Sequence, residues 1–261
     1  MHMNMRPMLL FLLLTAALPG VAMAQASSQP GDTVSADIQR AVADPARAAD
    51  QADDARRKVA QVMAFAQVKP GQKVLELMPG KGYFTRVFSA LVGPQGRVYT
   101  VWPQEAEKYS AKAFADITAQ AAGPYYANIR LLKQPAAKLT TPEPVDLVFT
   151  SQNYHDYPDS FMGKADLLAL DRQAFAALKP GGLFVVIDHV AAAGSGLTQT
   201  ETLHRIDPAT VRQQVEAAGF VFDGESQALR NPDDPHTAKV FDPSIRGHTD
   251  QFMYRFRKPA Q

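Results

Sequence analysis

Cysteine is absent from the 261-residue sequence, which excludes disulfide bonds, thiolate metal sites and cysteine nucleophiles. Neither sign of charge is in excess, since 27 Lys and Arg stand against 26 Asp and Glu. No block of Lys or Arg occurs either, so we expect no nucleic-acid binding and no polybasic membrane anchor. No internal repeat is visible, which disfavours solenoids and propellers. The 46% of hydrophobic residues are enough to build a large buried core.

Long hydrophobic runs are also missing. The longest, Met8–Leu18, has about eleven residues, whereas ~20 are needed to span a bilayer. It follows Arg6, and Ala22-Met23-Ala24 has the pattern of a signal-peptidase site before Gln25. Residues 1–24 are therefore predicted to be a secretory signal peptide. We expect a periplasmic or secreted protein, cleaved between Ala24 and Gln25, without stable membrane association.

The remainder of the chain alternates short apolar runs with helical patterns. Continuous apolar strands between helices are typical of a parallel sheet covered on both faces. We predict an α/β domain over residues 67–261, preceded at residues 25–66 by a leader and a helical segment interrupted at Asp44-Pro45. Residues 50–65 of that segment could lean over a ligand cleft of the sheet, but Arg56 and Arg57 are more simply expected on a solvated helix face. Strands are predicted at 73–77, 97–102, 129–132, 145–150, 183–188, from 221 and at 251–256, and helices at 83–92, 105–122, 166–178 and 208–218.

The first predicted strand ends in Glu76-Leu77-Met78-Pro79-Gly80-Lys81-Gly82. In open α/β sheets a ligand binds beyond the carboxyl ends of the strands. Glycines let the backbone approach such a ligand, and the following helix offers free N–H groups. Glu76 would accept hydrogen bonds from an amine or hydroxyl. Alone, the pattern equally fits an ordinary turn between a strand and a helix.

A second pattern, Leu178 to Asp188, joins the end of a helix, a Pro-Gly-Gly turn and an apolar strand. Together the two patterns resemble the motifs of class I S-adenosylmethionine-dependent methyltransferases, and Glu216–Phe220 with two final strands resembles the usual ending of that family. The resemblance spans roughly Gln67 to Lys258. It implies a Rossmann-like seven-stranded, mostly parallel sheet with helices on both faces, an antiparallel last strand, and S-adenosylmethionine as the cofactor.

Within that family, the sequence most resembles a subgroup of exported bacterial predicted methyltransferases. The residues that carry this likeness are Glu76–Gly80, Asn153–Asp156 and the Arg-Asn-Pro and Phe-Asp-Pro segments near the end of the chain.

Three positions depart from the general pattern of the family. Met78 stands where a glycine is usual, and we expect it to reshape the methionyl end of the cofactor site. Trp102 replaces the acid that binds the ribose, and we expect it to stack on adenine unless Glu105 reaches the ribose. Gln134 stands in for the acid that reads the adenine amino group. The predicted cofactor-binding residues are Glu76, Met78, Gly80, Gly82, Trp102, Gln134 and Asn153.

Chemistry is predicted near His155, in the loop that follows the fourth strand and that in this family faces the reacting methyl group. We expect His155 to act as the base, Asp156 to orient it, and Tyr154 or Asn153 to position a small-molecule substrate. Asn, His and Asp are also common loop residues that bond their own backbone, so a structural role stays open.

Four further residues, His189, His204, Arg205 and Arg246, are expected on the same rim of the sheet, where they would line the substrate site. The histidines would then converge with His155 and, together with Asp156 or Asp188, would suit zinc or iron, but their spacing is irregular and we assign no metal.

The long segment from Leu229 to Thr249 contains three prolines and is either a lid over the site or a structural cover.

The sequence thus predicts a methyltransferase that acts on an unidentified small-molecule nucleophile. Two alternatives stay open: an exported binding protein that uses the fold without catalysis, and a metal-dependent hydrolase built on the histidines. No pattern identifies the methyl acceptor or an oligomeric state.

Overall fold

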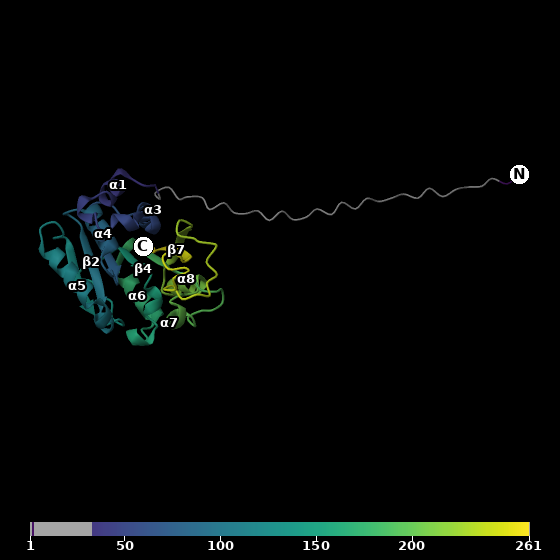
Figure 1. Cartoon of the computed structure of the whole chain (residues 1–261). Helices are drawn as coiled ribbons and strands as arrows, with labels where there is room; N and C mark the ends of the chain where they lie inside the picture. Colours follow the sequence, from purple (N-terminus) through teal and green to yellow (C-terminus); the bar gives the residue numbers. More distant parts are fainter. Residues whose placement is uncertain (1, 3–32, 261) are drawn as a thin grey trace.

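The computed structural model describes residue 2 and residues 33–260, so the predicted signal peptide lies outside the described residues. Seven strands form one sheet in the order β3-β2-β1-β4-β5-β7-β6. Helices lie around this sheet (Figure 1). All neighbouring pairs are parallel except those of β7, which runs antiparallel to β5 and β6. The predicted seven-stranded sheet with its antiparallel last strand is therefore confirmed. The strands are β1 Lys73–Leu77, β2 Arg97–Pro103, β3 Ile129–Gln134, β4 Val145–Ser151, β5 Leu178–His189, β6 Val221–Ser226 and β7 Gln251–Arg257.

Helices connect the strands, and short helical turns precede the first strand. The α-helices are α1 Ala36–Val42, α2 Asp54–Arg57, α3 Val59–Ala66, α4 Tyr83–Val92, α5 Glu107–Ala122, α6 Leu167–Ala177, α7 Thr200–Leu203 and α8 Pro208–Ala217. The 3-10 helices are η1 Pro45–Arg47, η2 Gln51–Asp53, η3 Gln104–Ala106, η4 Tyr154–Asp156 and η5 Ser160–Met162. No helix in the described part of the chain is long and apolar enough to cross a bilayer.

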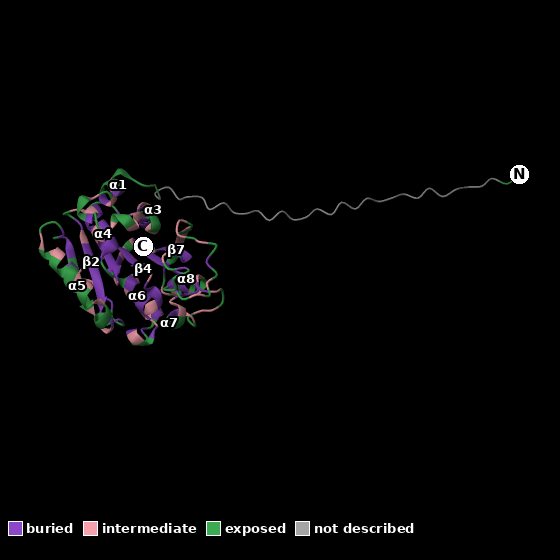
Figure 2. Ribbon diagram, viewed as in Figure 1, coloured by how far each residue is buried: buried purple, intermediate pink, exposed green. Residues whose placement is uncertain are grey.

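Strand residues alternate between two hydrophobic cores, one on each face of the sheet. Val74 of β1 faces the core that α1, α3 and α4 cover, whereas its neighbour Leu75 faces the core that α6 and α8 cover. Because both faces are covered, the central strands β4 and β5 contain continuous apolar runs, Leu147–Phe149 and Leu183–Ile187. The edge strands β3 and β6 are more polar and partly exposed. Figure 2 shows the strands buried and the outer surfaces of the helices exposed. The N-terminal helices thus belong to the same packed unit as the sheet.

The start of the fifth strand differs from the prediction, whereas the predicted break at Asp44-Pro45 is present. The fifth strand begins at Leu178, before the Pro-Gly-Gly turn, because Leu178 pairs with Val145 across an irregularity in β4. The break at Asp44-Pro45 is present: α1 ends at Val42, and the Asp44 side chain accepts a hydrogen bond from Ala46 at the start of η1. Proline at the first position of a helix costs no hydrogen bond, which explains the new start.

The tail loop, residues 227–250, connects β6 to β7 and is fastened from within. Arg205 is fully buried and donates two hydrogen bonds to Asp234, of 2.8 and 3.0 Å. Arg205 also donates to the carbonyls of Val190 and Ala238. A second buried carboxylate, Asp250, binds Arg230 and His236. Arg205, predicted as a substrate residue on the rim, is thus a structural tether, and the contacts of the loop are those of a structural cover.

Removal of one partner of the pair of Arg205 and Asp234 is expected to lower the stability of the folded protein. Asp234→Ala leaves a buried guanidinium without its counter-charge, for which we expect a loss of about 3–5 kcal/mol of stability. Urea unfolding measures the loss, and hydrogen exchange should show faster exchange over residues 227–250. Asp233→Ala, which removes an exposed neighbouring carboxylate, is the control. Equal stability of the two variants would contradict the tether.

Candidate functional site

The central parallel strands end at one edge of the sheet, and the backbone there takes unusual conformations. Met78 follows β1 with φ 47°, and Gln152 follows β4 with φ 62°. Both lie in the left-handed region that residues with a side chain seldom adopt. Such conformations gather at functional sites, where the surrounding structure enforces them. The backbone therefore marks the same edge that the sequence indicated.

The turn after β1 requires glycine. Gly82 has φ 77° and immediately precedes α4, and a Cβ on it would lie 2.7 Å from Cδ1 of Ile117. No side chain caps α4, whose first N–H groups therefore face the turn without an intrahelical partner. This is the geometry that binds polar or anionic groups of a ligand. A hollow of about 740 Å³ opens beside Gly80 and Lys81, within the usual volume of a ligand site.

Glu76 lies at the end of β1 and is almost fully buried. Burial raises the pKa of its carboxyl to about 7, against the lowering effect of a 2.5 Å hydrogen bond from the Thr85 hydroxyl. A buried carboxylate with one protein donor is destabilising unless other donors reach it. Glu76 therefore has the capacity to accept a ligand hydroxyl or amine.

Asn153, predicted to bind cofactor, is bonded to the backbone instead. Its side-chain amide donates to the carbonyls of Met78 and Leu77, at 2.8 and 3.3 Å, and its oxygen accepts from the Thr150 hydroxyl. These bonds fix the loop after β4 against the end of β1. Asn153 thus holds the two halves of the edge together.

The predicted adenine contacts need correction. The Trp102 indole is 3% exposed, donates its N–H to Thr100 and packs edge-on against Phe114, so it presents no free face for stacking. The Gln134 side chain bonds both the N–H and the carbonyl of Thr140. Glu105 accepts from the N–H of Ala136 rather than lying free for a ribose. Gln134 and Glu105 thus stabilise the loop after β3, and Trp102 joins β2 to α5.

The histidine cluster centres on the buried carboxylate of Asp188. Asp188, at the end of β5, accepts hydrogen bonds from the backbone N–H of His155 at 2.9 Å and of His189 at 2.8 Å. Its Oδ1 also lies 2.7 Å from Nδ1 of His155. Asp188 therefore orients the His155 ring from the Nδ1 side, in addition to Asp156, which lies 3.2 Å from Nε2. The position of Asp188 directly after an apolar strand was the available signal.

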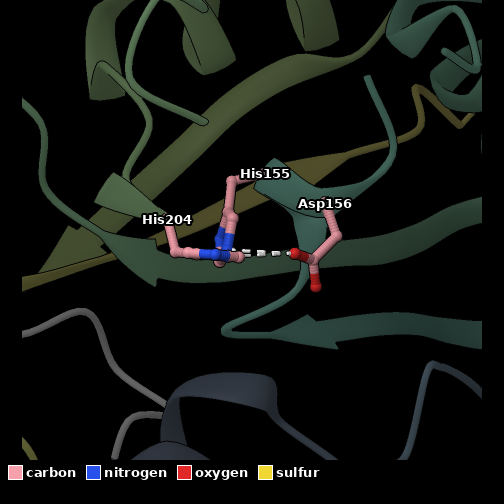
Figure 3. A group of neighbouring side chains, drawn as sticks. All are labelled: His155, Asp156 and His204. Carbon is pink, nitrogen blue, oxygen red and sulfur yellow. Dashed lines mark ion pairs between the residues drawn. The ribbon is translucent and has the colours of Figure 1, made fainter. Parts of the chain in front are cut away.

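Asp156 contacts two imidazoles. Its Oδ1 lies 3.2 Å from Nε2 of His155 and 3.6 Å from Nδ1 of His204 (Figure 3). These three donor atoms all lie within 4.8 Å of one another, so the group has the spacing to hold a divalent cation. The His189 ring centroid is 6.0 Å from that of His155, so the three predicted histidines lie together.

The charges of this cluster follow from its partners. Burial alone would lower the pKa of His155, but the charge of Asp188 and the hydrogen bonds to Asp156 and Asp188 raise it to about 10. Burial would raise the pKa of Asp156, but the hydrogen bonds from His155 and His204 hold it at about 2. His155 thus carries a proton at neutral pH, with both ring nitrogens engaged. This state does not suit the predicted role of His155 as a base.

Two other predicted residues have different environments. Tyr154 is fully buried, and its hydroxyl donates to Asp171 in the core, so it does not face a substrate. Burial lowers the pKa of His189 to about 4, and its Nδ1 lies 2.7 Å from the Thr249 hydroxyl. His189 is therefore a neutral imidazole, and it lines a cleft.

That cleft, of about 440 Å³, lies between α2, the ends of β4 and β5, and the tail loop. Arg246, predicted on the rim, lines it together with Arg56 and Arg57, which the sequence analysis had left on a solvated helix face. We call it the arginine cleft. Its lining residues are Arg56, Arg57, Gln152, His189, Val240, Phe241, Arg246, Gly247, Thr249 and Gln251.

The match to a known protein family lies in the part of the chain that contains β1 and β2. Residues 43–123 match the family protein-L-isoaspartate(D-aspartate) O-methyltransferase. A stretch of 62 residues is 42% identical to the protein-L-isoaspartate O-methyltransferase of Ignicoccus hospitalis, and it covers 23% of this chain and 29% of that protein. The chain therefore spans less than a third of the curated relative. The family match includes β1 and the glycine turn but none of the histidine cluster.

Solved structures share the whole fold. A SAM-dependent methyltransferase from Aquifex aeolicus aligns with TM-score 0.54 and 18% identity, over 85% of this chain and 96% of its own. The [4+2]-cyclase SpnF aligns with TM-score 0.57 and 16% identity, over 82% of each chain. The protein thus has the fold of class I methyltransferases. Because a structure described as a cyclase shares that fold, the reaction has to be argued from the site.

Asp188→Asn should change the charge of His155. Without the charge and hydrogen bond of Asp188, burial counts for more, and we expect the pKa of His155 to fall well below about 10, while the hydrogen bond to Asp156 remains. NMR titration of the ring measures this. In the wild-type protein the contribution of this pair to stability is fully present below pH 6.5 and is lost as the pH rises through about 10.

The matched control is Asp171→Asn, which alters another buried carboxyl, one bonded to Tyr154. It should leave the titration of His155 unchanged. A His155 that still titrates near 10 in the Asp188 variant would show that Asp188 does not set its charge.

Proposed function

We propose that this protein is an S-adenosylmethionine-dependent methyltransferase that acts on a small-molecule nucleophile. The observation that carries the proposal is the turn from Glu76 to Gly82, which lies within the segment that matches a methyltransferase family. A buried acid at the strand end, an obligatory glycine and an uncapped helix converge there. The fold is compatible with this activity.

The residues present fit the cofactor on its amino-acid side. Glu76 would accept hydrogen bonds from an ammonium or hydroxyl group, and the first N–H groups of α4 would donate to a carboxylate. The bound cofactor supplies a methyl group on a sulfonium sulfur, an electrophile that needs no activation by the protein. Met78, at the position where the resemblance expects glycine, has φ 47°, a conformation that favours glycine.

On the acceptor side the protein would act mainly by alignment. Methyl transfer requires the nucleophile to lie in line with the reacting carbon, which fixed side chains can arrange. His189 is neutral at physiological pH and faces the arginine cleft, so it can position an acceptor through a hydrogen bond. The cationic His155 stays paired with Asp188 and Asp156 and keeps this wall rigid.

We further propose that the protein works after export and belongs with the exported bacterial predicted methyltransferases that its sequence resembles. The support is the pattern of residues 1–24 and the shared Asn-Tyr-His-Asp and Arg-Asn-Pro segments.

Binding of the cofactor is the first test. S-adenosylmethionine or S-adenosylhomocysteine at ~100 times its dissociation constant should add about 2.7 kcal/mol and raise the thermal midpoint by about 5–10 °C. Calorimetric titration gives the affinity directly. Absence of both a midpoint shift and binding heat at millimolar concentrations of either ligand would reject the proposed function.

Glu76→Gln should change the folding stability and the cofactor affinity in opposite directions. Because the pKa of Glu76 is about 7 when folded and 4.5 when unfolded, stability falls as the pH rises through this interval. The variant avoids this loss, so between pH 4 and pH 8 we expect it to gain about 3 kcal/mol relative to wild type. Its affinity for the cofactor should fall about tenfold, since a charged acceptor is lost.

Glu225→Gln, an exposed substitution on an edge strand, is the control and should change neither quantity. A Glu76→Gln variant that gains stability and binds cofactor normally would place Glu76 outside the binding site.

A further inference from the structure

The arginine cleft contains positive charge without matching negative charge. None of its ten lining residues is an aspartate or a glutamate, whereas three are arginines. Among the described residues, the carboxylate paired with these arginines is that of Asp53, which lies 2.7 Å from Arg56. Arg57 and Arg246 form no ion pair within the described residues. The cleft therefore has two guanidinium groups free for an anion.

Arg57 is the most constrained of the three. Its guanidinium lies over the ring of Tyr83, 4.5 Å from the centroid, and near Phe84, and its Nε is buried without a hydrogen-bond partner. Burial and the neighbouring charge of Arg56 lower the pKa of Arg57. A cation held in this way is stabilised by an anion that forms charge-assisted hydrogen bonds with it.

The other walls are neutral and rich in donors. Gln152 and Gln251 are joined by a hydrogen bond of 2.9 Å across the ends of β4 and β7, and the Thr249 hydroxyl contacts the neutral His189. The tail loop closes the cleft at Gly247, which has φ 81° and packs against the Arg56 side chain. The space of about 440 Å³ suits a small molecule.

We propose that the arginine cleft binds an anionic group, a carboxylate or a phosphate, of the methyl acceptor. Planar guanidinium groups bind these oxyanions through paired hydrogen bonds. Tyr83, on which Arg57 stacks, directly follows Gly82, so the anion is anchored next to the cofactor turn. The assignment of the anion to an acceptor rests on the proposed function, whereas anion binding itself does not.

The test uses inorganic phosphate and succinate as probes, with the purified protein at constant ionic strength. Each anion should raise the thermal midpoint of the wild-type protein at millimolar concentration. In Arg57→Gln and Arg246→Gln the apparent affinity should fall about tenfold, the effect of losing one charge-assisted bond. Arg172→Gln, an exposed substitution in α6 outside the cleft, is the matched control.

Arg246 is exposed and makes no side-chain hydrogen bond, so its variant stays folded and keeps the test informative if the Arg57 variant does not fold. Equal anion affinity in wild type, Arg246→Gln and the control overturns the proposal. So does the absence of protection by both anions in the wild-type protein.

A second measurement distinguishes the acceptor from the cofactor, which also carries a carboxylate. We expect the affinity for S-adenosylmethionine to be unchanged in both cleft variants and unaffected by phosphate or succinate. Competition between the anions and the cofactor, with weaker cofactor binding in Arg57→Gln, would assign the cleft to the cofactor and overturn the acceptor proposal. If the wild-type protein binds the anions but no cofactor, the proposed function fails and the anion site stands.

Discussion

The site depends on one buried carboxylate, that of Asp188. It is fully enclosed and accepts hydrogen bonds from two backbone N–H groups and one imidazole. Because a buried charge is tolerated only when it is paired and hydrogen-bonded, this group fixes the end of β5 against the loop after β4. The resulting imidazolium of His155 in turn holds Asp156 ionised, and Asp156 contacts His204. One carboxylate thus sets a row of alternating charges along the sheet edge.

Two parts of the chain meet at this edge of the sheet, and the family match covers one of them, residues 43–123. The part that matches a known family supplies the glycine turn and, in α2, Arg56 and Arg57. The other part supplies the histidines and the tail loop, which closes over Arg56 at Gly247. The arginine cleft exists only because both parts contribute to it. Its position therefore depends on the buried pair of Arg205 and Asp234 that holds the tail loop.

Local patterns predicted the fold, but long-range pairing decided the site. Strands and helices followed from apolar runs and helical spacing, and the obligatory Gly82 lies in a recognisable turn. The role of Arg205 was missed because its partner Asp234 lies 29 residues further along the chain, in the tail loop. Arg57 was placed on a solvated face because its ring partners Tyr83 and Phe84 lie in α4, and the tail loop that lines the same cleft lies near the end of the chain. Sequence spacing carries no signal for contacts of this kind.

The edge thus combines two electrostatic environments with different roles. In the cluster around His155 the ionised groups are paired, so the arrangement is complete without a ligand and gives rigidity. In the arginine cleft the positive charge is unpaired, so an anion relieves it. His189 stands between them, and its neutrality matters, because a protonated ring there would face both His155 and the arginines. Burial keeps the His189 ring neutral. Anion binding is thereby confined to the arginine cleft, while the ion pairs of His155 keep the neighbouring wall of the cleft rigid.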